Sequence, residues 1–282
     1  MNDITVVTTF HQPGLSLYGQ RFIDSFAENV EHKVKLVVYA ENCSPTNPNP
    51  EQITILDAKE MLPKLNAFKE KYKDDPKANG IPPDHIKVKR PRDWHKKFKW
   101  DAIRFANKTY AVFDASNKAE DWLVWMDADS YIHSHWSYED FIALLPEDKW
   151  LTYVGRGKGS QTWPECGFYG MNLNHPICSL FLVEFELMYE DAENGMFKLE
   201  EWHDSYIFGE VLNRTLAANT NVLDYSADMY MKEAKTGGGG HPLINGPLGK
   251  FMDHMKGGRK DTGKSLDKDL MVNRSEAYWN SK

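Results

Sequence analysis

The hydrophobic pattern at the start of the chain alternates between short apolar runs and segments with helical spacing. Residues 4–10 are all β-branched or aromatic, and a turn signal, His11-Gln12-Pro13-Gly14, follows them, which predicts a short buried strand. Over 17–30, apolar side chains recur every three or four residues, so this segment is expected to be helical. Residues 34–40 form a second apolar run. Two apolar strands joined by a helix predict a parallel sheet with helices on both faces.

The rest of the chain continues in the same mixed α and β pattern. A Pro-rich and Asn-rich loop over 42–50, a charged loop over 74–93 and a Gly-rich loop over 155–160 separate the segments. From 225 onward the chain is irregular and rich in Gly, Lys and Asp, and no internal repeat or linker divides it. Further helices are expected over 58–73, 94–112, 138–145, 176–190 and 201–217, and further strands over 122–126, 150–154, from 167 and near 221–224.

Composition places the chain among ordinary globular proteins. Of 282 residues, 41% are hydrophobic and 27% are charged, which argues against disorder. The net charge of −7 makes non-specific polyanion binding by the whole surface unexpected. The 13% aromatic content, including 9 Trp and 13 Tyr, suits flat ligands and sugars, although most of these rings are expected in the core.

Cysteine usage and segment lengths bear on location. The three cysteines, Cys43, Cys166 and Cys178, are widely spaced and form neither a zinc pattern nor a disulfide framework, which favours a reducing compartment. No apolar run approaches the roughly 18 residues of a membrane span. The first residues lack the basic and long apolar regions of a secretory signal. We therefore expect a cytoplasmic protein without a membrane span.

Two acidic residues, Asp127 and Asp129, stand directly after the apolar run 122–126. Ligands of open parallel sheets bind beyond the carboxyl ends of the strands, and side chains two residues apart on an extended backbone point to the same side. Two carboxylates placed in this way repel each other unless a cation lies between them, and hard divalent ions prefer oxygen ligands. The pair predicts a divalent metal site that can neutralise a diphosphate; a solvated turn is the alternative.

The segment Trp125-Met126-Asp127-Ala128-Asp129 resembles the DxD motif of glycosyltransferases with the GT-A fold. The resemblance implies a nucleotide-sugar donor held through Mn²⁺ or Mg²⁺, with Asp127 and Asp129 as metal ligands and Asp127 and Ala128 beside the donor. It also implies a GT-A-like α/β fold, in which a mixed, mainly parallel sheet is flanked by helices. One domain over 1–282 would then comprise a nucleotide-binding half (1–130), an acceptor-side half (131–224) and an irregular segment (225–282) that closes over the metal and diphosphate.

A second motif stands near the end of the chain. His254-Met255-Lys256-Gly257-Gly258-Arg259-Lys260 resembles the H-x-x-G-x-x-K motif of family 8 glycosyltransferases, which include glycogenin and lipopolysaccharide galactosyltransferases. The resemblance implies that His254 is the third metal ligand and that Lys260 contacts the donor diphosphate. Imidazole suits Mn²⁺-type ions, and glycines let the backbone approach phosphate closely. Asp261-Thr262 stand where the family has Pro-Trp, and His241, after the four-Gly run 237–240, is the alternative third ligand.

The loop after the first strand is the expected site of the nucleotide base and ribose in GT-A enzymes. Thr8, Thr9 and Phe10 occupy that place, although they are equally consistent with the last core residues of a strand. Tyr18 can stack on a base. The resemblance to family 8 implies that the donor is a UDP-sugar.

The predicted helix over 94–112 aligns Lys97, Asp101, Arg104 and Lys108 at helical spacing. By itself such a stripe indicates a solvated charged face. The helix before the DxD motif supplies donor-sugar or phosphate contacts in similar enzymes, however, so Lys97 and Arg104 are candidate donor contacts.

Glu165 and Asp204 are the candidate catalytic carboxylates. The segment 164–172 resembles the acceptor-side strand of these folds, and Asp204 begins the predicted helix where many members place an acid. One carboxylate acts as general base if the reaction inverts the anomeric centre; if it retains configuration, Asp204 can stabilise positive charge. The alternative is that Asp204 only complements the helix dipole. Nearby rings that suit an acceptor sugar are Trp163, Phe168, Tyr169 and Trp202.

Together these features predict a divalent-metal-dependent glycosyltransferase that transfers a hexose or pentose from a nucleotide-sugar to a glycan or a modified nucleobase such as a DNA base. One alternative is a sugar-nucleotide nucleotidyltransferase, although no Gly-rich basic loop follows the first strand. The other is a non-enzymatic module for nucleic acid or glycan, whose basic clusters over 87–99 and 256–268 would contact phosphates.

Overall fold

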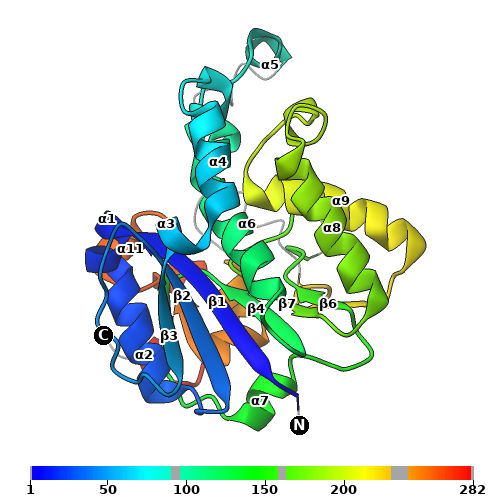
Figure 1. Ribbon diagram of the computed structural model, residues 1–282. Coiled ribbons are helices and arrows are strands. Elements are labelled where there is room, and N and C mark those ends of the chain that lie inside the picture. The colour runs from blue at the N-terminus through cyan, green and yellow to red at the C-terminus, as the bar shows by residue number, and fades with distance from the viewer. Residues whose placement is uncertain (1, 90–95, 158–162, 230–240, 281–282) are drawn as a thin grey trace.

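The computed structural model describes residues 2–89, 96–157, 163–229 and 241–280. Its centre is a seven-stranded sheet with the order β3-β2-β1-β4-β7-β6-β8 (Figure 1). Its strands run in one direction except β7, which is antiparallel to both neighbours. The predicted mixed, mainly parallel α/β fold is confirmed. The strands are β1 (Ile4–His11), β2 (Val34–Glu41), β3 (Ile53–Asp57), β4 (Trp122–Met126), β6 (Leu151–Tyr153), β7 (Phe168–Asn172) and β8 (Val222–Asp224).

Helices cover both faces of the sheet, because its strands are apolar on both sides. Along β4, Leu123 and Trp125 belong to one core cluster, whereas Trp122, Val124 and Met126 belong to the other, as the alternation of side chains along a strand requires. The first cluster includes side chains of α3 (Ala58–Met61), α4 (Pro63–Tyr72), α6 (Ala102–Ser116), α8 (Pro176–Glu190) and α9 (Asp204–Ala218), and the second includes those of α2 (Gln20–Asn29) and α7 (Tyr138–Ile142).

A small second sheet joins the middle of the chain to its C-terminal segment. β5 (Ser130–Ile132) pairs antiparallel with β9 (Met252–His254), and Ser130 lies opposite His254. The elements around β9 are short, as expected of an irregular segment. They are α10 (Pro242–Asn245), η6 (Pro247–Lys250), α11 (Arg259–Thr262), η7 (Asp267–Asp269) and α12 (Ala277–Asn280).

The helix predicted over 94–112 is wrong at its start. α6 begins at Ala102, because the Asp101 side chain accepts a hydrogen bond from the Arg104 N–H at 3.2 Å and caps the helix. Lys97 lies in a separate short 3-10 helix, η3 (Lys97–Trp100). It therefore does not share a helical face with Arg104, and Trp94 lies outside the described residues.

Several other boundaries differ from the sequence-based expectation. The helix expected over 58–73 is divided into α3 and α4 by Pro63, before which Leu62 leaves the helical conformation. The strands β3, β5 and β9 were not predicted: β3 is a short strand at the edge of the sheet, and β5 and β9 are three-residue strands that form only by pairing with each other. The region 74–93, expected to be a loop, contains η2 (Pro76–Asn79) and α5 (Asp84–Lys89), which project beyond the sheet in Figure 1.

The helix expected over 17–30 starts earlier, with α1 (Gln12–Gly14) and a π-helical turn, η1 (Leu15–Gly19), leading into α2. One further 3-10 turn, η4 (Met196–Lys198), lies between α8 and α9. None of the helices in the described ranges is long and apolar enough to cross a membrane.

Candidate metal and nucleotide site

The acidic pair is held at the carboxyl end of β4 by hydrogen bonds from three parts of the chain. The Asp127 N–H donates to the carbonyl of Gly167, just before β7, at 2.9 Å, and the Asp129 carbonyl accepts from the Met255 N–H at 2.8 Å. The Trp125 indole N–H donates to Asp127 Oδ1 at 2.7 Å. The turn is therefore fixed in place, and the two carboxylates are largely removed from solvent, with 28% and 12% of their side chains exposed.

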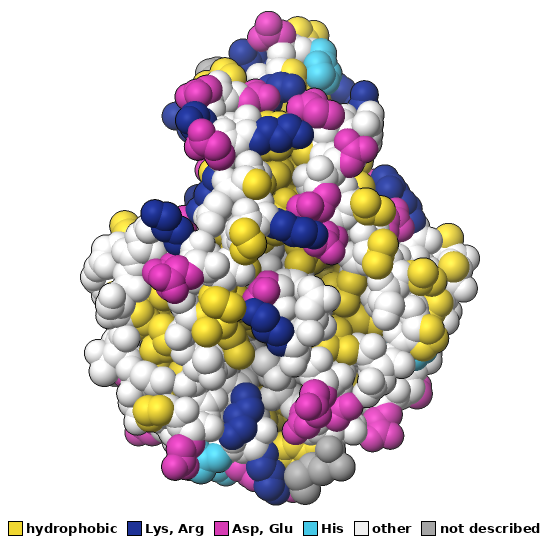
Figure 2. All heavy atoms as spheres, viewed as in Figure 1, with side chains coloured by type: hydrophobic (Ala, Val, Ile, Leu, Met, Phe, Trp, Pro, Cys, Tyr) yellow, Lys and Arg dark blue, Asp and Glu magenta, His cyan; other side chains and the backbone are white. Residues whose placement is uncertain are grey.

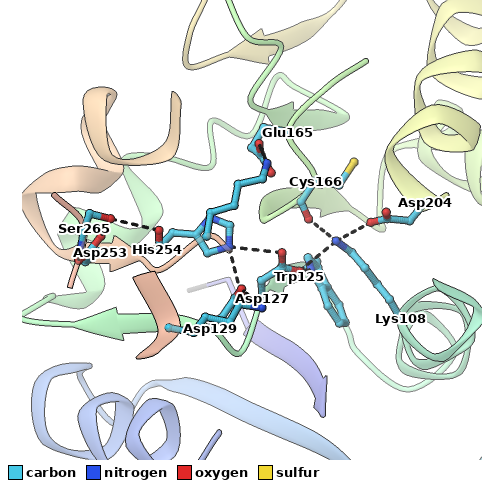
Figure 3. A network of polar contacts seen from close by, with 12 residues as sticks. Lys108, Trp125, Asp127, Asp129, Glu165, Cys166, Asp204, Asp253, His254 and Ser265 are labelled. Carbon is cyan, nitrogen blue, oxygen red and sulfur yellow. Dashed lines mark hydrogen bonds and ion pairs between the residues drawn. The ribbon is translucent and has the colours of Figure 1, made fainter. Parts of the chain in front are cut away.

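His254 lies against this pair although it is 125 residues away from Asp129 in the sequence (Figure 3). Its Nε2 atom is 3.0 Å from Asp129 Oδ1 and 3.6 Å from Asp127 Oδ2. One ligand atom of each of these three residues lies within 4.8 Å of the others. The pairing of β9 with β5 brings the histidine to this place, because it sets His254 opposite Ser130.

His241, the alternative third ligand, lies beside this cluster. Its ring centroid is 4.6 Å from that of His254, but His241 does not join the three-residue cluster found among the described residues. Neither of its buried ring nitrogens has a hydrogen-bond partner within the described ranges. The four-Gly run 237–240 that precedes it lies outside the described residues.

The donor set of the cluster fits a divalent metal ion. Two carboxylates and an imidazole nitrogen suit Mn²⁺, and carboxylates suit Mg²⁺. Burial by itself would lower the pKa of His254, but Asp129 and Asp127 outweigh it and raise that pKa to about 10. Burial raises the pKa of Asp127, whereas Lys108 and His254 lower it more strongly. A proton on His254 thus partly compensates the carboxylates in the metal-free protein, as a bound cation would.

Lys108 belongs to the site, although the sequence suggested only a solvated stripe for it. Its Nζ atom is 3.1 Å from Asp127 Oδ1 and 2.8 Å from Asp204 Oδ2, and it donates to the carbonyl of Cys166 (Figure 3). Its side chain is only 10% exposed. Lys108 is buried on α6 together with Thr109 and Val112, a position that the charged stripe of the sequence did not indicate.

A small cavity of about 180 Å³ opens beside the acidic pair, between the carboxyl ends of β1 and β4. These strands are neighbours, and the chain leaves them towards opposite edges of the sheet, which is where ligands bind in open α/β sheets. The predicted donor residues that line it are Thr9, Phe10, Tyr18, Arg104, Asp127, Ala128 and Lys260, together with the metal candidate Asp129.

Lys260 links the metal candidates to the wall of this cavity. Its Nζ atom is 2.7 Å from Asp129 Oδ2 and 4.9 Å from the centre of the Tyr18 ring. Burial raises the pKa of the Tyr18 hydroxyl, so this ring is neutral at ordinary pH. A cation and a flat ring thus face the same space.

Two residues predicted for the site, Thr8 and Lys97, line neither this cavity nor the second one described below. Thr8 is fully buried in β1 and Lys97 points elsewhere from η3, so neither is among the residues that line these cavities. Thr8 lies two residues further from the carboxyl end of β1 than Phe10, on the same side of the strand, and is fully buried there.

A second cavity, of about 420 Å³, lies on the other side of the acidic pair. It is lined by both candidate catalytic carboxylates, Glu165 and Asp204, as well as by His254, Lys108 and Lys260. Asp204 is the first residue of α9 and is bound by Lys108. The cavity therefore brings together residues from the middle and the C-terminal part of the chain.

Glu165 is enclosed by two cations. Its Oε2 atom lies 2.6 Å from Arg156 Nη2 and 2.7 Å from Lys256 Nζ. Burial would raise the pKa of Glu165, but Lys256 and Arg156 hold it well below its usual range. Arg156 itself has a φ of 70°, which costs a non-glycine residue free energy. The Gly-rich loop that begins here continues over 158–162, outside the described residues.

Comparison with solved structures finds proteins that resemble this chain. The chain is similar to the apo structure of WbbM, a bifunctional glycosyltransferase, with a TM-score of 0.44 and 13% sequence identity over 79% of this chain. The match spans 38% of that protein's length. No protein-family model matches the sequence. No curated protein matches it either.

Proposed function

We propose that this chain is a divalent-metal-dependent glycosyltransferase that moves a sugar from a UDP-sugar to an acceptor. The observation on which the proposal rests is the cluster of Asp127, Asp129 and His254 between two adjoining cavities, with Lys260 beside it. An enzyme of this kind needs a nucleotide site and an acceptor site on either side of a diphosphate-binding centre. The resemblance to family 8 and the UDP donor are parts of this proposal that rest on sequence motifs, and the cytoplasmic location rests on the three widely spaced cysteines.

The small cavity is suited to the nucleotide. Thr9 and Phe10 at the end of β1 would contact base and ribose, and the Tyr18 ring offers a face for stacking. Lys260 and Arg104 would contact the diphosphate as fixed positive charges. A divalent ion held by Asp127, Asp129 and His254 would neutralise charge that develops on the leaving diphosphate.

Of the two candidate catalytic carboxylates, Asp204 is the better placed to act on the acceptor. Glu165 is held between two cations, Lys256 and Arg156, on one of its oxygens, whereas Asp204 contacts the single cation Lys108, which it shares with Asp127. Glu165 would instead orient these two cations in the larger cavity. Asp204 faces the same cavity from the start of α9, where it would accept the proton of an acceptor hydroxyl or stabilise positive charge near the anomeric carbon.

Calorimetry of UDP binding tests the central claim. Mn²⁺ should be required for tight binding, and Asp129→Asn should weaken UDP binding by at least tenfold in the presence of Mn²⁺, because it removes one charge from the metal centre. The matched control is Asp148→Asn, since Asp148 is 67% exposed near the amino end of β6, away from the site. Unchanged UDP affinity in Asp129→Asn would contradict the proposal.

Product analysis separates the proposed reaction from its nearest alternative. Incubation with UDP-sugars and Mn²⁺ should release UDP and free sugar when water replaces the acceptor. Release of pyrophosphate from a nucleoside triphosphate and a sugar phosphate would instead indicate a nucleotidyltransferase.

A further inference from the structure

A third and larger cavity, of about 900 Å³, adjoins the proposed reaction centre around Asp204. It lies between η3, the ends of β6 and β8, and one face of α9. It shares Phe98 and Trp163 with the 420 Å³ cavity that contains Asp204. The three cavities thus form a row, from the small nucleotide pocket past the metal candidates to this wide space.

The walls of this cavity combine aromatic rings with hydrogen-bonding groups. Its rings are those of Phe98, Tyr153, Trp163 and Tyr206. Its polar groups include Asn213 and Glu210, both on α9. Among the described residues the Glu210 side chain has no hydrogen-bond or ion-pair partner, so its oxygens are available to a ligand. Rings that stack on the apolar faces of sugars, beside carboxylate and amide groups that bind hydroxyls, make a site suited to carbohydrate.

We propose that this cavity binds the distal sugar units of a neutral oligosaccharide acceptor, whose terminal unit reaches past Trp163 to Asp204. The inference rests on the proposed function and adds the class of acceptor to it. The volume of the cavity lies within the roughly 300–1,000 Å³ of small-molecule sites, and it adds to the space of the 420 Å³ cavity. A single monosaccharide would leave the outer cavity unused.

The charges around the cavity argue against a nucleic-acid acceptor. In its lining, the carboxylates of Glu201, Glu210 and Asp224 outnumber the two lysines, Lys96 and Lys99, so the cavity is less favourable for a phosphate backbone. The buried Lys99 in the wall is ion-paired with Glu201 at 3.0 Å. On the face shown in Figure 2, acidic and basic side chains are interspersed and no broad basic surface is visible. A neutral glycan meets none of these objections.

Buried contacts fix the wall between the two cavities. The Lys99 Nζ atom lies 5.1 Å from the centre of the Trp163 ring, and the second carboxylate oxygen of Glu201 is 3.1 Å from His203 Nε2. The centre of the His203 ring lies 4.5 Å from that of the Trp163 ring. His203 immediately precedes Asp204 in the chain. The aromatic wall and the candidate catalytic carboxylate are therefore positioned by one network.

Binding of neutral glycans tests this inference. The full chain, with UDP and Mn²⁺, is applied to an array of neutral oligosaccharides of one to four units and, in parallel, to single-stranded and double-stranded DNA. The best glycan is then titrated by saturation-transfer NMR. We expect a tri- or tetrasaccharide to bind at least fivefold more tightly than its terminal monosaccharide, and Glu210→Ala to remove that advantage. The control is Glu139→Ala, on the exposed surface of α7.

The outcomes distinguish this inference from the proposed function. If UDP binds in the presence of Mn²⁺ but no neutral oligosaccharide is retained, or if DNA is retained instead, the acceptor class is wrong and the transferase proposal stands. Equal affinity for the monosaccharide and the longer glycan would likewise overturn the inference that the outer cavity binds distal sugar units. Absence of UDP binding to the wild-type chain in the presence of Mn²⁺ would contradict the proposed function itself.

Discussion

Lys108 places one positive charge between two buried carboxylates from different parts of the fold. Asp127 follows β4 and Asp204 begins α9, and both lie within 3.1 Å of its Nζ atom. Burial by itself would lower the pKa of Lys108, but Asp127 and Asp204 outweigh it and raise that pKa well above its usual range. The lysine therefore stays charged at neutral pH.

Removing this charge should be costly. Lys108→Met leaves two buried carboxylates without their shared partner, and breaking a buried ion pair in this way costs about 3–5 kcal/mol. We expect urea denaturation to show a loss of unfolding free energy of that order. The double variant Lys108→Met/Asp204→Asn should recover part of it, because one uncompensated carboxylate is removed. A single variant as stable as the wild type would show that Lys108 does not compensate these charges.

The proton on His254 should make metal binding depend on pH. The metal-free protein holds this imidazole protonated, with a pKa of about 10, whereas a metal ligand must be neutral. Mn²⁺ must therefore displace a proton, and its apparent affinity should rise by up to about tenfold per pH unit below that pKa.

Calorimetry at pH 7 in two buffers with different ionisation enthalpies measures this proton. We expect release of about one proton per Mn²⁺ bound in the wild type and in His85→Asn, which alters an exposed histidine on α5. In His254→Asn the release should disappear together with most of the affinity. Proton release that persists in that variant would point to another ligand, with His241 the first to examine.

At the scale of elements, the position of β9 decides where His254 lies. The side chain of Asp253 points to the opposite face of β9 and is fully buried. It accepts hydrogen bonds from the Ser265 N–H at 2.8 Å, the Ser265 hydroxyl at 2.6 Å and the Tyr278 hydroxyl at 2.8 Å. These bonds fasten the C-terminal turns to the strand that presents the metal ligand.

Asp253→Ala should loosen this arrangement without touching the metal candidates. It removes the acceptor of three hydrogen bonds, and a buried donor that is left unsatisfied costs about 1–3 kcal/mol. We expect faster amide hydrogen exchange over 252–280 and at least tenfold weaker Mn²⁺ binding, since β9 would no longer hold His254 in register. Asp267→Ala, at an exposed position in η7, is the control. Normal exchange and normal Mn²⁺ affinity in Asp253→Ala would show that β9 is held by other contacts.

At the scale of the whole molecule, the site is assembled from both ends of the chain. The 180 Å³ cavity is lined by Thr9 and Tyr18 from the N-terminal part, Asp127 from the middle and Lys260 from the C-terminal segment. A ligand that contacts all of these parts stabilises the folded state by binding it and not the unfolded chain.

Thermal denaturation should reflect this arrangement. UDP and Mn²⁺ together should raise the melting temperature by more than the sum of their separate effects, because each completes the other's site. At a free ligand concentration of 100 times Kd the gain is about 2.7 kcal/mol. EDTA should abolish the joint effect, and GDP or CDP with Mn²⁺ should give a smaller shift. An equal shift with GDP would contradict the preference for uridine, and no joint shift would contradict a shared site.

Much of this protein could be read from local sequence. The apolar runs of β1, β2 and β4 predicted a parallel sheet, and the place of Asp127 and Asp129 after β4 predicted a site at its carboxyl edge, because both properties depend on neighbouring residues. The strands β5 and β9 were not predicted, because each has only three residues and forms a strand only by pairing with the other, distant segment.

The C-terminal motif implied His254 and Lys260 as neighbours of the acidic pair, but only the tertiary structure shows how His254 reaches it and that Lys108 joins it. Pairing of β9 with β5 brings His254 to Asp129, and the packing of α6 against the sheet turns Lys108 inward to Asp127 and Asp204. Strand register and helix packing depend on contacts between distant segments, such as His254 and Asp129, which are 125 residues apart, and a local pattern does not contain them. The sequence alone thus determined the kind of sheet and the edge where its acidic pair lies, and the fold decided the charges and ligands that surround that pair.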